Sequence, residues 1–172
     1  MAEALATVTR VDGLGMISIR ADLARAGDAI ADAAGLALPD MTRITTDGRR
    51  WLGWMSPDEL LLILPAQDHR EVQTALEQAL AGEHALVADV SDLRAVFDVI
   101  GPHADDVIAK LSPADLAAMP TDGLRRSRAA QTAAGFWRVE GGFRVFGFRS
   151  TADYLHLILR NAAIPGSQLA PR

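Results

Sequence analysis

The stretch Arg50–Leu64, RWLGWMSPDELLLIL, decides the fold class. Arg50–Met55 and Leu60–Leu64 each have the length and the apolar, aromatic content of a strand. Ser56-Pro57-Asp58, between them, is a turn sequence. A helical pattern with apolar residues four positions apart then runs over Asp68–Leu80. Two strands joined by one short turn and followed by a helix predict a mixed α and β fold with antiparallel strands.

The second half of the chain repeats this order of elements. The corresponding strands and helix are predicted at Phe136–Val139, Phe143–Phe148 and Thr151–Asn161. The periodicity of this last helix is expected to turn Tyr154 inward. Each half also begins with a strand, Met16–Arg20 or Ala95–Ile100, that is followed by a helical pattern. The two halves therefore have matching element orders along their whole length.

Matched positions in the two halves lie at a nearly constant spacing. Ile17 and Phe97 are 80 residues apart, and Pro39 and Pro120 are 81 apart. We interpret this spacing as an internal duplication; the alternative is that α+β domains share this order by chance. The predicted fold is α+β, with two tandem β-α-β-β-α (ferredoxin-like) halves at residues 1–86 and 87–163. The halves are expected to pack as one compact unit, and residues 164–172 to form a flexible tail.

The composition excludes several classes of chemistry. The chain has 172 residues, a formal net charge of −5 and no cysteine, which excludes disulfides, thiolate zinc sites, cysteine-ligated iron–sulfur clusters and a cysteine nucleophile. Lys110 is the only lysine, and no phosphate-binding glycine loop surrounds it. An acidic chain lacks the basic surface of a nucleic-acid binder. Without a signal-peptide pattern or a long apolar run, we expect a cytoplasmic protein that has no membrane partner.

No catalytic residue and no metal site are predicted. The four histidines lack metal-ligand spacing, and His69 is expected to be an exposed residue at a helix start. Gly13-x-Gly15 precedes a strand, whereas a dinucleotide-binding loop follows one. Asp89 and Asp92 are candidates for a carboxylate pair, but a cap or turn is the preferred interpretation of Asp and Ser residues in this segment.

Five side chains are candidates for an interface with another molecule. On a strand, Arg126 and Arg128 would share one face and Arg125 would lie on the other. These arginines are either solvated strand residues or the binding surface for an anionic or protein partner. Trp51 and Trp54 would lie on opposite faces of their strand, so that one faces the core. The other tryptophan would be exposed unless a partner covers it.

Several motifs resemble known families. The segment Ala88–Phe97, ADVSDLRAVF, followed by Gly101-Pro102-His103-Ala104, is similar to the opening of folate-binding aminomethyltransferase domains such as those of the glycine-cleavage T-protein. The wider pattern resembles the gamma subunits of heterotetrameric sarcosine oxidases over about residues 11–163. The residues that carry this second resemblance are Leu14-Gly15, Trp51–Trp54 running into Pro57–Leu62, Arg128–Thr132 and Ser150–Leu155.

The resemblance implies a role in sarcosine catabolism. Heterotetrameric sarcosine oxidases demethylate sarcosine oxidatively to glycine, with hydrogen peroxide and either formaldehyde or methylene-tetrahydrofolate as the other products. Their beta subunit carries FAD and a covalently attached FMN, and their alpha subunit binds NAD and tetrahydrofolate. The resemblance therefore implies an accessory, non-catalytic gamma subunit of an oxidoreductase complex, with alpha, beta and delta subunits as partners. It implies no cofactor on this chain itself.

Two alternatives remain open at this point. Asp89 matches an aspartate of the T-protein type by motif position, which makes it a candidate for a folate-type site in a stand-alone module that binds tetrahydrofolate or another one-carbon carrier. T-proteins are about twice as long and have a further domain, so a complete aminomethyltransferase is not expected. The other alternative is a hydrolase or transferase that uses Asp89, Ser91 or a histidine.

Overall fold

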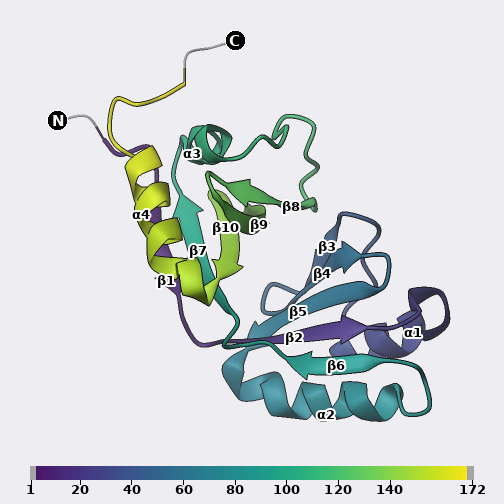
Figure 1. The fold of residues 1–172 in the computed structure, drawn as a ribbon. Coiled ribbons are helices and arrows are strands. Elements are labelled where there is room, and N and C mark those ends of the chain that lie inside the picture. The colour runs from purple at the N-terminus through teal and green to yellow at the C-terminus, as the bar shows by residue number, and fades with distance from the viewer. Residues whose placement is uncertain (1–2, 170–172) are drawn as a thin grey trace. The chain divides into compact units, whose positions relative to one another are not determined.

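The computed structural model describes residues 3–169, which form two compact units (Figure 1). Unit 1 comprises the residues up to Asp12 together with those from Leu93 onward, and unit 2 is Gly13–Asp92. These bounds differ from the predicted division at residues 86 and 87. Two short strands cause the difference, because each pairs with a strand that lies far from it in the sequence.

Unit 2 is a five-stranded antiparallel sheet with two helices. Its elements are β2 (Leu14–Arg20), α1 (Leu23–Ala34), β3 (Ile44–Thr46), β4 (Trp51–Ser56), β5 (Glu59–Pro65), the 3-10 turn η1 (Ala66–Asp68), α2 (His69–Ala79) and β6 (Leu86–Asp89). The strand order is β3-β4-β5-β2-β6. Helices α1 and α2 contact each other, and their apolar faces pack with the sheet residues into one core.

Unit 1 has the same plan. Its elements are β1 (Thr7–Val11), β7 (Arg94–Ile100), α3 (Ala104–Leu111), β8 (Leu124–Ala129), β9 (Thr132–Val139), β10 (Gly142–Phe148), the 3-10 turn η2 (Arg149–Thr151) and α4 (Ala152–Ala162). The strand order is β1-β7-β10-β9-β8, again antiparallel throughout.

The two sheets match strand for strand once β1 is set in the place of β6. Both strands lie at an edge of their sheet, β6 beside β2 and β1 beside β7, and each pairs with that neighbour in antiparallel register. In unit 2 this strand follows α2 in the sequence, whereas in unit 1 it comes from the N-terminal segment. The mixed α and β class with two antiparallel sheets is confirmed. The ferredoxin-like description of each half stays a prediction, because each sheet has five strands.

Local sequence signals position the helices. The side chain of Asp22 accepts a hydrogen bond from the backbone N–H of Ala24 (3.0 Å), which caps the start of α1. Gly35 ends the helix in the left-handed region, at φ 70°, where glycine has no steric penalty. In α4, Leu155 and Leu159 are fully buried, but Tyr154 points outward and is 40% exposed. The prediction that Tyr154 faces inward is therefore wrong.

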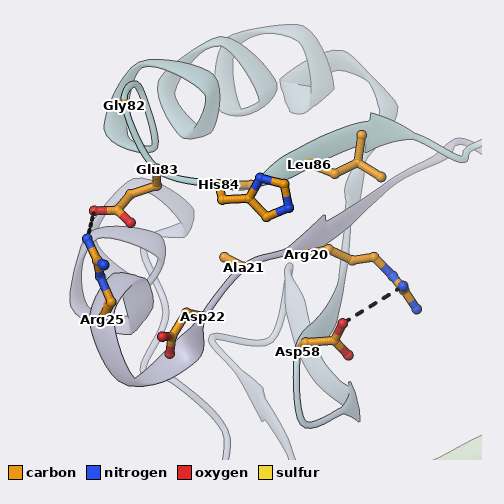
Figure 2. Close-up of a pocket in the computed structure, with 10 residues that line it drawn as sticks. Arg20, Ala21, Asp22, Arg25, Asp58, Gly82, Glu83, His84 and Leu86 are labelled. Atoms are coloured by element: carbon orange, nitrogen blue, oxygen red, sulfur yellow. Dashed lines mark hydrogen bonds and ion pairs between the residues drawn. The ribbon is translucent and has the colours of Figure 1, made fainter.

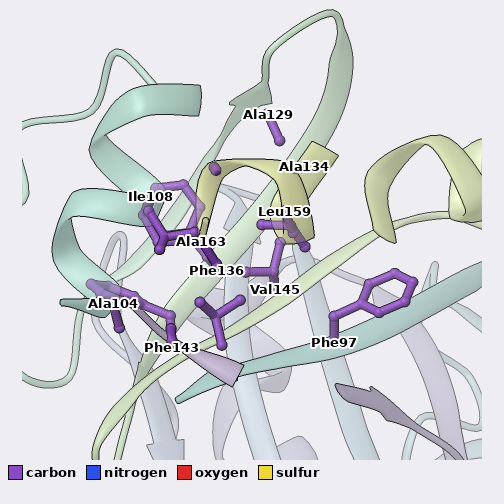
Figure 3. Close-up of a cluster of buried hydrophobic side chains, with 14 of the residues drawn as sticks. Phe97, Ala104, Ile108, Ala129, Ala134, Phe136, Phe143, Val145, Leu159 and Ala163 are labelled. Carbon is purple, nitrogen blue, oxygen red and sulfur yellow. The ribbon is translucent and has the colours of Figure 1, made fainter. Parts of the chain in front are cut away.

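Aromatic side chains form the centre of the unit 1 core. Phe97, Phe136 and Phe143 lie together there with residues of α3 and α4 (Figure 3). Phe136 and Phe143 meet edge to face, with ring centroids 6.0 Å apart. The unit 2 core is instead aliphatic, with Ile and Leu side chains as its largest members. Each core draws its residues from its own unit alone.

The predicted flexible tail begins with a hydrogen-bonded turn. Ser167 Oγ donates to the carbonyl of Ile164 (2.6 Å). Lys110 Nζ, on α3, donates to Ser167 Oγ (2.8 Å) and to the carbonyl of Ala162 at the end of α4 (2.7 Å). Residues 170–172 of this predicted tail lie outside the described residues. The sole lysine of the chain thus links the end of α4 to α3.

Truncating Phe143 tests the aromatic core. Phe143→Ala should lower the free energy of unfolding by about 3–5 kcal/mol, because the ring is fully buried and its removal leaves a cavity. Phe148→Ala is the matched control: Phe148 lies on the same strand but is 40% exposed, so a loss of about 1 kcal/mol or less is expected. Urea denaturation measures both values. Equal losses for the two variants would contradict the assignment of Phe143 to the core.

Candidate functional site

The turn after β6 contains a group of polar residues joined by hydrogen bonds. Asp89 Oδ1 accepts hydrogen bonds from the backbone N–H of Ser91 (2.9 Å) and from Ser91 Oγ (2.6 Å). Ser91 Oγ in turn accepts one from the backbone N–H of Met16 (2.9 Å), and the N–H of Val90 donates to the Met16 carbonyl (2.9 Å). These bonds fasten the end of β6 to β2. The turn role predicted for Asp89 and Ser91 is confirmed.

His69 stands beside this turn, at the start of α2. Its Nε2 lies 3.2 Å from Asp89 Oδ1, in an orientation that does not make a hydrogen bond. The imidazole is only 13% exposed, so the predicted exposed histidine is wrong. The cause is Gly15 on β2, because a Cβ at that position would lie 2.8 Å from His69 Cδ2. A glycine there leaves the space that the imidazole fills.

The electrostatics of the turn stabilise the charged form of Asp89. Hydrogen bonds from the Ser91 hydroxyl and then from its backbone N–H hold the pKa of Asp89 below its usual value, and the nearby His69 adds a smaller effect. The order of contacts is Ser91, Asp89, His69. In a nucleophilic triad the histidine must lie between the serine and the carboxylate. No histidine therefore lies between Ser91 and Asp89, so the cluster lacks the serine–histidine–carboxylate order of a triad hydrolase.

A second group of charged residues lines a surface cavity of about 700 Å³ in unit 2 (Figure 2). Arg25 on α1 pairs with Glu83 after α2 (Nη2 to Oε1, 3.2 Å). Arg20 at the end of β2 pairs with Glu59 (3.1 Å) and lies 3.9 Å from Asp58. The hydrogen bond and the charge of Glu59 raise the pKa of Arg20. Both arginines of the cavity have carboxylate partners, so their charges are balanced within the chain.

The two tryptophans lie on opposite faces of β4, as predicted. Trp54 packs against the unit 2 core, on the face that α1 and α2 cover. Trp51 lies on the other face, where its cross-strand neighbour is Ile63. Both side chains are half-buried rather than exposed. Their assignment to a partner interface stays a prediction.

The three arginines lie on β8, the outer strand of the unit 1 sheet. Arg126 and Arg128 are exposed on one face, and Arg125 is half-buried on the other, as the alternation predicts. Charged residues on an outer strand discourage pairing with a foreign strand, which gives these side chains a local role. Their contribution to a partner interface also stays a prediction.

Within residues 3–169, no group of three or more His, Asp or Glu side chains is placed to hold a metal ion. No helix in that range has the length and apolar content needed to span a bilayer.

The chain is thus a two-unit α and β protein. Most of the hydrogen-bonded and charged groups described above connect its own helices, strands and turns to one another. Comparison with known families identifies it further. The model of the sarcosine oxidase, gamma subunit family matches residues 19–165, and the chain belongs to that family. The family expected from the sequence motifs is confirmed.

Individual relatives agree with this assignment. The sarcosine oxidase subunit gamma of Corynebacterium sp. (strain P-1) is 37% identical over 91 residues, which are 51% of this chain and 43% of that protein. The match thus spans less than half the length of this curated relative. A chain of the heterotetrameric sarcosine oxidase from Corynebacterium sp. U-96, solved in complex with pyrrole 2-carboxylate, has a TM-score of 0.87 at 26% identity. That match covers 97% of this chain and 88% of the other.

The expected likeness to T-proteins is also found. The glycine cleavage system aminomethyltransferase T from Bartonella henselae matches with a TM-score of 0.68 at 16% identity. The match covers 92% of this chain but only 46% of that protein. At this level of identity the likeness concerns the fold alone.

Replacing Asp89 tests the role of the turn. The folded state favours the ionised carboxylate, so its contribution to stability is present near neutral pH and is lost as the pH falls through the depressed pKa. Asp89→Asn should therefore cost about 1 kcal/mol at pH 7, because the carboxylate is partly screened by water, and nothing in strong acid. Thermal unfolding between pH 2 and pH 7 measures this difference. Asp32→Asn, at an exposed position on α1, is the control for the substitution itself and should change the free energy of unfolding at pH 7 by about 0.5 kcal/mol or less.

Proposed function

We propose that this chain is a subunit of a heterotetrameric sarcosine oxidase, in which it supports the assembly and takes no part in the chemistry. The observation that carries the proposal is the structural match to a chain of such an enzyme over 97% of the present chain. The family assignment over residues 19–165 supports it independently, from sequence.

The non-catalytic role is supported by what the reactive side chains do. Asp89 and Ser91 hold β6 to β2, and His69 fills the space above Gly15. Each of these groups has a structural task that accounts for its position. Ser91 donates its hydroxyl hydrogen bond directly to Asp89, so His69 is not placed as the base of a serine nucleophile.

In the proposed assembly, sarcosine is demethylated oxidatively to glycine, with hydrogen peroxide and formaldehyde or methylene-tetrahydrofolate as the other products. FAD, FMN, NAD and tetrahydrofolate are held by the partner alpha and beta subunits, and a delta subunit completes the assembly. Gly13-x-Gly15 does not fit a dinucleotide-binding loop, because it connects β1 to β2 and not a strand to a helix, and Gly15 faces His69.

Purification of the tagged chain from its native host tests the proposal. We expect larger chains to co-purify, together with a flavin absorbance spectrum and sarcosine-dependent formation of hydrogen peroxide. The chain expressed alone should be colourless and inactive. A flavin bound to the isolated chain, or a tagged chain that purifies by itself from the host, would refute the proposal.

A tetrahydrofolate-binding module is the alternative function. It rests on the likeness to the T-protein fold, which by itself does not define a site. The Asp89 carboxylate already accepts two hydrogen bonds from Ser91 through Oδ1. Titration of the isolated chain with tetrahydrofolate, followed by tryptophan fluorescence, separates the two functions. Saturable binding that Asp89→Asn abolishes would favour the module.

A further inference from the structure

Helices α2 and α4 occupy the same position in their respective units. Each has 11 residues and follows the last strand of a β-hairpin through a 3-10 turn. Their inward residues also correspond: Val72 and Leu76 in α2 match Leu155 and Leu159 in α4. The two helices are therefore structurally equivalent, and the residues on the outer face of α4 can be compared position by position with those on the outer face of α2.

The outer faces of the two helices differ in polarity. At the positions where α2 has Glu71 and Thr74, both exposed, α4 has Tyr154 and Leu157, which are 40% and 63% exposed. Because α2 has the same fold position with polar residues, the fold does not require apolar residues there. Two large apolar side chains on the outer face of α4 therefore indicate contact with another molecule.

A hollow lies at the C-terminal end of the same helix. Ile164, which follows the helix, is 49% exposed and lines a surface cavity of about 460 Å³. The opposite wall comes from the N-terminal segment and β1, with Ala4, Ala6 and Val8. These small side chains leave room for one large apolar group. Buried anchors of this kind contribute much of the binding energy at interfaces.

The charges beside the apolar surface specify its partner further. Asp153 and Arg160 are seven residues apart on α4, which places them about 10 Å apart on one side of the helix. Neither forms an ion pair within residues 3–169. Arg160 is also the one charged side chain among the described residues that line the hollow. A matching surface therefore presents an acidic group beside the hollow and a basic group two helical turns away.

Resting on the proposed function, we propose that Tyr154, Leu157 and Ile164, with the hollow beside them, are the docking surface for a larger subunit of the sarcosine oxidase. That subunit inserts a large apolar side chain into the hollow and pairs an acidic side chain with Arg160. A larger subunit, and not a second copy of this chain, is the occupant, because the solved chain that this one matches over 97% of its length belongs to a heterotetramer, which is assembled from different chains.

The test gives α4 the outer residues of α2. The double variant Tyr154→Glu/Leu157→Thr, expressed with the larger subunits, should retain them at least tenfold more weakly than the wild type. The matched control is Glu71→Gln/Thr74→Ser on α2, which should retain them as the wild type does. Binding of the larger subunits to the tagged chain, measured by surface plasmon resonance, supplies the comparison.

Two more variants keep the test decisive. Ala4→Phe fills the hollow at an exposed position and should also weaken retention, without loss of thermal stability. Arg160→Glu should weaken it and reduce its dependence on salt.

Wild-type retention by both Tyr154→Glu/Leu157→Thr and Ala4→Phe would overturn the docking surface and leave the proposed function intact. Failure of the wild-type chain to retain any larger subunit would instead refute the proposed function. Self-association of the wild type that these variants abolish, with the larger subunits still bound, would identify a second copy as the occupant and also overturn the inference.

Discussion

Each unit depends on one strand, β2 in unit 2 and β7 in unit 1, that has a neighbour on both sides. The backbone groups of a buried strand must be paired on both sides, and β2 and β7 each receive their second neighbour from a short strand distant in the sequence. In unit 2 that neighbour is β6, and the Asp89–Ser91 turn fastens its end to β2. In unit 1 it is β1, which aligns with β7 over five residue pairs. The division of the chain into units follows from these two pairings.

The helices and strands that can be predicted from the sequence are those with strong local hydrophobic periodicity. The apolar strands β4 and β5, the helix α2 and their counterparts in unit 1 follow from periodicity and turn residues. The strands β1, TVTRV, and β6, LVAD, contain no fully buried residue and lack a clear alternation, so only their long-range pairing defines them. The burial of His69 could not be predicted for the same reason, because Gly15, which leaves the space for the imidazole, lies on β2, far from His69 in the sequence.

The candidate site could be predicted only in part. The turn role of Asp89 and Ser91 was predictable because Asp and Ser bond to neighbouring backbone groups within a few residues. The outward position of Tyr154 was not predictable, since helical periodicity treats a tyrosine as a core residue. The structure shows that Tyr154 is a surface residue, and the comparison with α2, whose outer face is polar, shows that the fold does not require an apolar residue there. Asp89, Ser91 and His69 thus have structural roles within unit 2. The residues without such a role are the apolar side chains on the outer face of α4.

The origin of β1 has a consequence for the time course of folding. A chain synthesised from its N-terminus produces β1 first, but Thr7 must wait for Ile100 before it has its pairing partner. All of unit 2, residues 13–92, emerges from the ribosome in the interval. Unit 2 can close while β1 is still an unpaired strand, whereas the sheet of unit 1 can be completed only after both units have been synthesised. The N-terminal strand is therefore synthesised before unit 2 but gains its place in a sheet after unit 2 has been synthesised.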